Sequence, residues 1–192
     1  MIRICLATFL SILLVSCSKS KKEESTELNH ILNAVLKNES AHKGSAHLQY
    51  TINKELQPLT VYVPTAKEIS GEEPGPSSIS SKSIVRILNL NHSRPEDRKS
   101  DSLHLLKQKQ YVFDYIPLDK TINPSIRLAG KKEADQRNRI YRFSNPLYLN
   151  DSTVYIESIF FDTSFGIGFG YMLEKQRDGS WTVKKMINTF IT

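Results

Sequence analysis

"FGIGFGYMLEKQRDGSWTV", residues 165–183, carries the clearest strand pattern of the chain. Over its first half, Phe, Ile, Phe, Tyr and Leu alternate with Gly, Gly, Gly, Met and Glu, and this period of two predicts a β-strand with one apolar face. Asp178-Gly179 then favours a tight turn, and a second strand follows from Trp181. We therefore expect an antiparallel β-hairpin in this part of the chain.

The three closely spaced glycines of this stretch, at positions 166, 168 and 170, do not fit a phosphate-binding loop. Such a loop opens a helix and needs the wider Gly-x-Gly-x-x-Gly spacing or a following Lys-Ser/Thr pair. We expect instead that the glycines let a backbone or an aromatic ring approach the strand, or permit a β-bulge. Simple alternation along the returning strand predicts one face formed by Trp181, Val183, Ile187 and Ile191.

Strands are also expected upstream of the hairpin. "TVYIESIFFD", residues 153–162, is apolar on both faces, which predicts a central position in the sheet. Shorter segments with a period of two predict further strands at 47–52, 59–64, 84–91 and 111–118. A short helical segment is expected at 103–110.

An amphipathic helix is predicted over residues 22–42. Aliphatic side chains recur there at i, i+3, i+4, i+7 and i+8, namely Leu28, Ile31, Leu32, Val35 and Leu36. Because a lone helix of this length is marginal in water, its apolar stripe is expected to pack on the sheet. The predicted fold class is therefore α+β, with one N-terminal amphipathic helix packed on a mainly antiparallel β-sheet and a C-terminal β-hairpin.

Two segments are rich in polar residues. Residues 68–83, "EISGEEPGPSSISSKS", contain six Ser, two Gly and two Pro, and are expected to form an exposed loop. Residues 127–142 carry six basic and two acidic side chains, which fits a solvated surface better than a binding patch. The net charge of +6 comes from 26 basic and 20 acidic residues mixed along the chain, so no nucleic-acid partner is expected.

Near the start of the chain, residues 4–15 follow Arg3 and form a short apolar segment. Its 12 residues would span about 18 Å as a helix, at ~1.5 Å per residue, whereas a hydrocarbon core is ~30 Å thick. The segment therefore has the length of the apolar region of a signal peptide, and is too short for a membrane-spanning helix.

At the end of this segment, Leu14, Val15, Ser16 and Cys17 resemble the lipobox of bacterial lipoproteins. The resemblance implies cleavage between Ser16 and Cys17, a diacylglyceryl group on the Cys17 sulfur, and as a rule an acyl chain such as palmitate on the new amino terminus. The only other cysteine, Cys5, lies in the segment to be removed, so the mature chain would form no internal disulfide.

The expected organisation is a lipoprotein signal peptide at 1–16, a flexible polar tether at 17–24, and a single α+β domain at 25–192. Ser18 stands where an aspartate retains proteobacterial lipoproteins in the inner membrane, so the resemblance implies the outer membrane. The Lys-Glu-Glu run at 22–24 resembles the export tag of surface lipoproteins of Bacteroidota, although it lies farther from the cysteine than usual. Periplasmic and surface-facing positions therefore both stay open.

Two other interpretations of the N-terminal region are open. Cys17 could be a buried or free thiol, but a cysteine between an apolar export signal and a lysine-rich segment is neither buried nor well protected in an oxidising compartment. A secreted eukaryotic protein could carry glycans at the Asn-x-Ser triplets that begin at Asn38, Asn91 and Asn150. The complete lipobox weighs against both interpretations.

The segment from Phe143 to Val183 resembles the C-terminal part of small uncharacterised lipoproteins of Bacteroidota. The shared features are a Ser-x-Pro motif before a strand, a glycine-rich strand, and an Asp-Gly-x-Trp hairpin. These motifs are structural, so the resemblance implies no activity.

No group of residues predicts a catalytic or metal site. The histidines are scattered, at His30, His42, His47, His92 and His104. With no cysteine left to join them, we expect no metal and no cofactor apart from the covalent lipid. The carboxylate pairs Glu72-Glu73 and Glu96-Asp97 lie in loops, where adjacent side chains point apart.

We expect a membrane-anchored lipoprotein of the bacterial envelope whose folded part is a non-catalytic binding or structural module. An envelope protein and an anionic glycan are both open as its partner. One alternative is a small envelope hydrolase, in which a pocket gathers groups such as His104, Asp101 or Asp114 around a nucleophile. Another is an inhibitor or immunity-type lipoprotein that presents the 68–83 loop to a protein.

Overall fold

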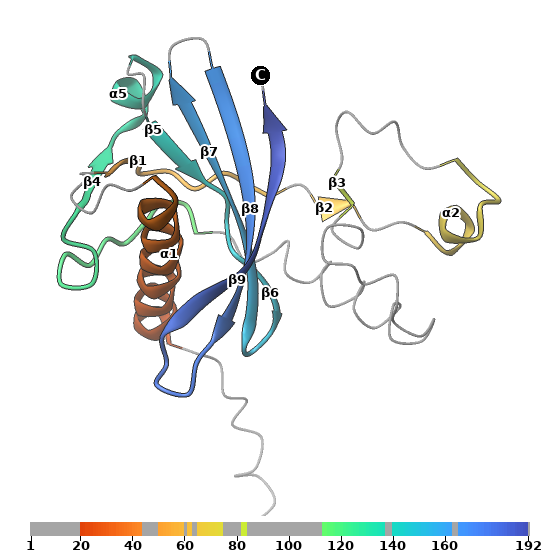
Figure 1. The fold of residues 1–192 in the computed structure, drawn as a ribbon, viewed down its shortest axis with the longest axis horizontal. Helices are drawn as coiled ribbons and strands as arrows, with labels where there is room; N and C mark the ends of the chain where they lie inside the picture. The colour runs from red at the N-terminus through yellow and green to blue at the C-terminus, as the bar shows by residue number, and fades with distance from the viewer. Residues whose placement is uncertain are drawn as a thin grey trace, which may run out of the picture.

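The structure, a computed structural model, describes residues 20–43, 50–59, 61–62, 65–74, 82–83, 113–136, 140–162 and 165–191. Its elements are α1 (Lys21–Lys43), β1 (Tyr50–Asn53), β2 (Val61–Tyr62), α2 (Ala66–Ser70), β3 (Lys82–Ser83), β4 (Ile126–Ala129), α5 (Lys131–Gln136), β5 (Ile140–Phe143), β6 (Leu147–Asn150), β7 (Thr153–Asp162), β8 (Phe165–Lys175) and β9 (Trp181–Ile191) (Figure 1). Among the helices described, none combines the length and the apolar character needed to cross a bilayer.

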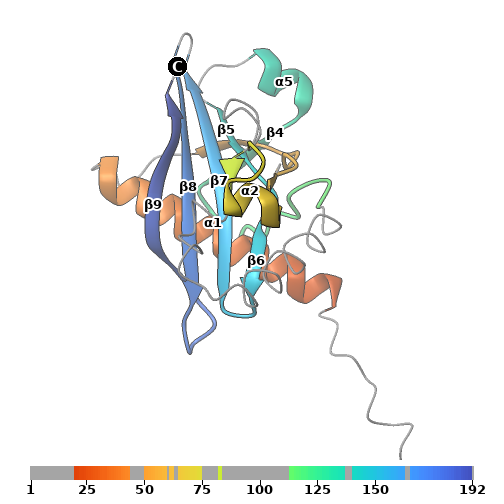
Figure 2. The ribbon, with the colours of Figure 1, turned by 90° about the vertical axis from the view of Figure 1, so that its right-hand side faces the viewer.

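The predicted α+β fold is confirmed. Seven strands form one sheet in the order β4-β1-β5-β7-β8-β9, with β6 beside β7. Pairs within β5 to β9 are antiparallel, whereas β1 is parallel to β4 and β5. α1 lies on one face of this sheet, and α2 with the small β2–β3 pair lies on the other side, as Figures 1 and 2 both show.

Helix α1 forms where the aliphatic stripe predicts it, and all five residues of the stripe are at most 6% exposed. Its start is fixed by a capping box, in which Glu23 N donates to Ser20 Oγ and Ser20 N donates to Glu23 Oε2. The predicted flexible tether at 17–24 therefore overlaps the N-cap and first turn of α1 over residues 20–24. The reason is the Ser-x-x-Glu sequence, which satisfies the free backbone N–H groups of the first turn.

The core lies between α1 and the sheet. Val154, Ile156, Tyr171 and Leu173 of β7 and β8 are fully buried and share one face. This α1 face of the sheet is the apolar face predicted for 165–173. Strand β7 is central, as its two apolar faces predict, because it pairs with β5 and β6 on one edge and β8 on the other.

The returning strand differs from the prediction. The register between β8 and β9 shifts between Met172 and Leu173, and again between Gly168 and Phe169, which marks two irregularities of the β-bulge kind. Each shift adds one residue on β9 and inverts the alternation of its side chains. Ile187 therefore lies opposite Gly170, on the far face, and its predicted place beside Trp181 is wrong.

Two further segments also differ from their predictions. Residues 113–118 form no strand, and only Tyr115 makes an isolated bridge, to Glu55. Pro117 cannot donate to a ladder, and its carbonyl accepts from a side chain of α1 instead. In the predicted loop at 68–83, the last three residues of α2 and the two residues of β3 are regular. The predicted elements at 84–91 and 103–110 lie outside the described residues.

Candidate functional site

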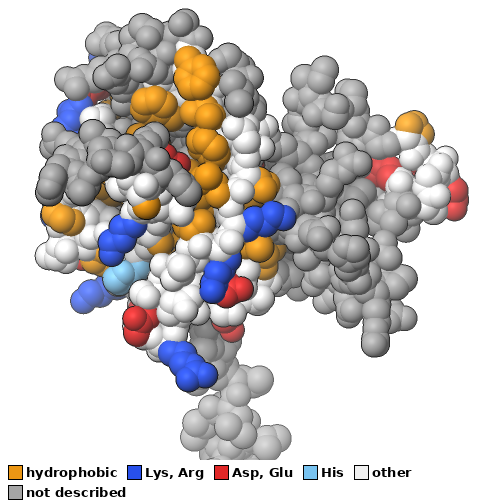
Figure 3. Space-filling view, viewed as in Figure 1, with side chains coloured by type: hydrophobic (Ala, Val, Ile, Leu, Met, Phe, Trp, Pro, Cys, Tyr) orange, Lys and Arg blue, Asp and Glu red, His pale blue; other side chains and the backbone are white. Residues whose placement is uncertain are grey.

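A partly exposed apolar strip lies on the α1 face of the sheet, where the described elements do not cover it fully. Along β8, exposure rises from Tyr171, which is fully buried, through half-buried Phe169 to Phe165, which is 45% exposed. The strip consists of Phe160, Phe165, Ile167, Phe169 and Met186, which the strand register places on this face. Figure 3 shows hydrophobic side chains in a column along the upper part of β8.

The position of α1 explains why part of the strip stays exposed to solvent. The helix crosses the strands obliquely and runs past the edge strand β9 (Figure 2). One of its contacts with the strip is at Met186, whose Sδ lies 3.7 Å from Asn38 Nδ2. A helix is about 10 Å wide, whereas a strand of 11 residues such as β8 is ~35 Å long. Because α1 crosses β8 and does not run along it, α1 covers only part of the length of β8.

A buried polar group borders the strip on its inner side. Tyr171 Oη donates a hydrogen bond to Glu39 Oε1, and both residues are at most 4% exposed. Burial, followed by the hydrogen bond to Glu39, raises the pKa of Tyr171. The phenol therefore stays protonated and serves as a hydrogen-bond donor, so this pair fixes α1 on β8.

The end of the β7–β8 hairpin also exposes an aromatic side chain on the opposite face. Phe161 is 40% exposed and lies opposite Gly166 in the register. The guanidinium of Arg142 stands 5.5 Å from the centre of the Phe161 ring, within the range of a cation–π contact. Both faces of this hairpin end, at Phe161 and at Phe165, therefore present large apolar area to solvent.

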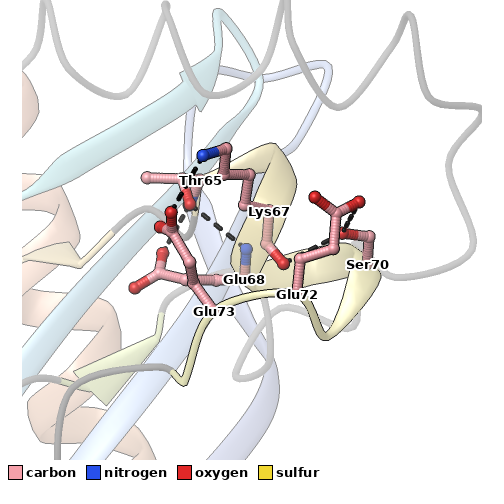
Figure 4. Close-up of polar contacts among 6 residues, drawn as sticks. All are labelled: Thr65, Lys67, Glu68, Ser70, Glu72 and Glu73. Carbon is pink, nitrogen blue, oxygen red and sulfur yellow. Dashed lines mark hydrogen bonds and ion pairs between the residues drawn. The ribbon is translucent and has the colours of Figure 1, made fainter.

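The carboxylates singled out in the predicted loop do not converge. Glu72 Oε1 accepts from Ser70 Oγ at 3.0 Å, whereas Glu73 Oε1 pairs with Lys67 Nζ at 3.1 Å (Figure 4). Both partners belong to α2, which has a capping box between Thr65 and Glu68. These acids stabilise a short surface helix, and their separate partners give them none of the geometry of a glycosidase pair.

Other residues singled out in the sequence are placed as follows. Asp114 is exposed, and His30 is half-buried on α1. The hydrogen bond from the Thr121 side chain is the first cause that lowers the pKa of Asp119, and the nearby His30 contributes. Within the described part of the chain, no three His, Cys, Asp or Glu side chains gather as metal ligands would. Cys17, Asp101, His104, Glu96 and Asp97 lie outside the described residues.

The apolar strip was missed in the sequence. The alternation of Phe165, Ile167 and Phe169 predicts an apolar strand face correctly, but it does not tell a covered face from an open one. One signal could have indicated an open face: the sequence predicts only one long helix to cover a sheet that contains a long strand.

Comparison with protein-family models, with curated proteins and with solved structures finds no match to this chain. The functional argument therefore rests on the site itself.

Proposed function

We propose that this chain is a lipid-anchored, non-catalytic binding module of the bacterial envelope, which docks a protein partner on the apolar strip. The lipobox supports the anchor, since it supplies Cys17 as the acceptor of the lipid. Ser18 stands in place of the aspartate that retains proteobacterial lipoproteins in the inner membrane, which supports an outer-membrane location. The folded part needs no cofactor for this role.

The observation that carries the proposal is the exposure of the strip. Phe165 at 45% and Met186 at 38% are large apolar side chains left in water on a sheet face whose other half is a closed core. Contiguous apolar surface of this kind, rimmed by polar residues, marks interaction sites. The strip thus has the composition of an interface core.

A protein fits the strip better than a small ligand or a glycan. The strip runs along a strand and is open to solvent at Phe165, whereas small-ligand sites enclose most of the ligand surface. Aromatic residues and Met are among the types enriched at protein interfaces, and the strip offers Phe165, Phe169 and Met186. An anionic glycan would need convergent cations, and the strip itself contains none.

Site-specific photo-cross-linking in the native envelope tests the docking. A photoreactive residue at Phe165 should capture one discrete partner, whereas the same residue at Thr182, an exposed position on the opposite face of β9, should not. Adding Met186→Ser should lower the yield at 165 several-fold, while circular dichroism stays unchanged. Equal capture at 165 and 182, or no effect of Met186→Ser, would contradict the docking site.

The anchor has an independent test. Mass spectrometry of the native protein should find an acylated peptide that begins at Cys17, and Cys17→Ala should leave an uncut precursor. A processed protein with a free Cys17 thiol would refute the anchor and leave the docking experiment unaffected.

A further inference from the structure

The connection between the proposed anchor and the folded body is short. α1 begins at Lys21 with Ser20 as its N-cap, so only residues 18 and 19 separate Cys17 from the cap. Three residue steps reach at most about 10 Å, at ~3.5 Å each. A lipid on Cys17 would therefore hold the first turn of α1 close to the bilayer.

That first turn belongs to a larger surface at one end of the body. One turn further along α1, Glu27 Oε1 pairs with Lys175 Nζ at 2.6 Å, and Lys175 N donates to Ser152 O at 2.8 Å. These contacts join α1 to the turn end of the β8–β9 hairpin and to the β6–β7 turn. Figures 1 and 2 both show these two turns at the end of the body from which α1 starts.

We call this surface the base, and define it as residues 20–24, 150–152 and 176–180. Its side chains are polar, and Lys21, Lys22, Asp151, Arg177 and Asp178 are all exposed. A surface without exposed apolar anchors suits contact with headgroups and does not suit insertion among acyl chains.

The base carries both signs of charge, since Lys21, Lys22 and Arg177 lie among Glu23, Glu24, Asp151 and Asp178, so it suits headgroups that carry both a phosphate and an ammonium group. Lys21 and Lys22 stand in the first turn of α1, at the positive end of the helix dipole, where cations are disfavoured. Glu23 and Glu24 offset part of this repulsion within the helix, and the phosphate groups of headgroups next to the two lysines would offset more of it.

The exposed end of the apolar strip lies at the opposite end of the body. β8 runs from Phe165 to Lys175, and ten steps of ~3.3 Å separate these residues by about 33 Å. The α5 helix lies at the same end of the body as the start of β8 in both ribbon views.

We propose that the base rests on phospholipid headgroups, so that the body stands upright and presents the Phe165 end of the strip away from the membrane. The proposal rests on the anchor proposed at Cys17. It adds an orientation, which determines that the partner docks from the aqueous side and not from within the bilayer.

Quenching by labelled lipids tests this orientation on the native acylated protein. Because the Cys17 sulfur is lipidated and Cys5 is removed, one introduced cysteine would be the only free thiol. Arg177→Cys labels the base, and Lys132→Cys, on α5, is the matched control of the same exposed, basic type. Each fluorescent protein is reconstituted into phosphatidylethanolamine–phosphatidylglycerol vesicles that contain a headgroup-attached quencher.

We expect several-fold stronger quenching at 177 than at 132, and at Phe165→Cys as weak as at 132. Equal quenching at 177 and 132 would overturn the orientation, and stronger quenching at 132 would reverse it. Mass spectrometry of the same samples detects the acyl chains on the peptide that begins at Cys17. Their absence would overturn the anchor as well, which distinguishes failure of the anchor from failure of the orientation.

Discussion

Lys175 Nζ forms a 2.6 Å ion pair with Oε1 of Glu27, which lies 148 residues earlier in the chain. Glu27 is only 7% exposed, and the same ammonium stands 5.7 Å from the centre of the Trp181 ring. One lysine thus connects α1 to both strands of the last hairpin. It lies at the end of the fold where the proposed anchor would act, so it would hold the base together.

Lys175→Met should destabilise the fold by about 1–3 kcal/mol, because a buried carboxylate loses this ion pair while the side chain keeps its length. The side chain of Lys175 is one-third exposed, which keeps the loss below that of a fully buried pair. Urea unfolding followed by tryptophan fluorescence measures the change, since Trp181 lies beside the pair.

Lys184→Met is the matched control. Lys184 pairs with Glu174 at 3.4 Å, and both side chains are about half exposed. Surface pairs of this kind contribute between 0 and ~1 kcal/mol. Similar losses for the two variants would show that burial of Glu27 does not set the strength of the first pair.

Gly170→Ala should destabilise the protein by about 2–3 kcal/mol through overpacking. The ring of Tyr155 lies against Gly170, as expected for a glycine that lets an aromatic ring approach, and a Cβ at 170 would stand 2.2 Å from the Tyr155 hydroxyl oxygen. Tyr155 is 1% exposed and cannot move away freely. The shift of the urea midpoint measures the cost.

Gly170→Ala should cost less in a Tyr155→Phe background than in the native protein, because the second change removes the nearest atom and leaves ring carbons at 2.8 Å. Gly130→Ala is the control, since no atom lies within 4 Å of its added Cβ. A neutral Gly170→Ala would mean that the ring yields, and would contradict close packing at this point.

Asn29→Ala should cost about 2–3 kcal/mol, since this fully buried amide has partners on a distant loop. Its Nδ2 donates to Pro117 O at 2.7 Å, and its Oδ1 accepts from Asp119 N at 2.8 Å. Loss of both bonds should accelerate hydrogen exchange of the Asp119 amide. Asn33→Ala, which removes a single bond to Ile122 O, should cost about 1 kcal/mol or less. Equal costs would contradict the role of Asn29 as the main link.

Local sequence patterns predicted the elements whose conformation depends on residues close by in the chain. The stripe from Leu28 to Leu36 predicted α1, and Asp178-Gly179 predicted a turn in which Gly179 has a φ of +83°. The place of Ile187 could not be predicted, because the two register shifts of β9 depend on its pairing with β8. A period of two holds only while no residue is inserted.

The candidate site escaped prediction for a related reason. Whether Phe165 and Phe169 are core or surface depends on where α1 crosses the sheet, and that crossing is set by contacts such as the hydrogen bond between Tyr171 and Glu39. These residues are 132 positions apart. The strand predicted over 111–118 rests on alternation alone, although Pro117 limits such a strand to an edge.

Alkaline titration should separate buried from exposed tyrosines. Burial is the first cause that raises the pKa of both Tyr155 and Tyr171, and a carboxylate partner, Glu157 or Glu39, adds to it. A pKa raised in the folded state means that these phenols stabilise the fold fully below the unfolded value of 10.0, and less as the pH rises above it.

We therefore expect that at least two of the eight tyrosines fail to ionise in the native protein above pH 10.0, and that they ionise only as the chain unfolds. Tyrosinate absorbance should rise in two phases, the second coincident with loss of circular dichroism. The double variant Tyr155→Phe/Tyr171→Phe is the control, because its second phase should lose the amplitude of two phenols. A single phase that is complete before unfolding would contradict the buried, hydrogen-bonded state of both side chains.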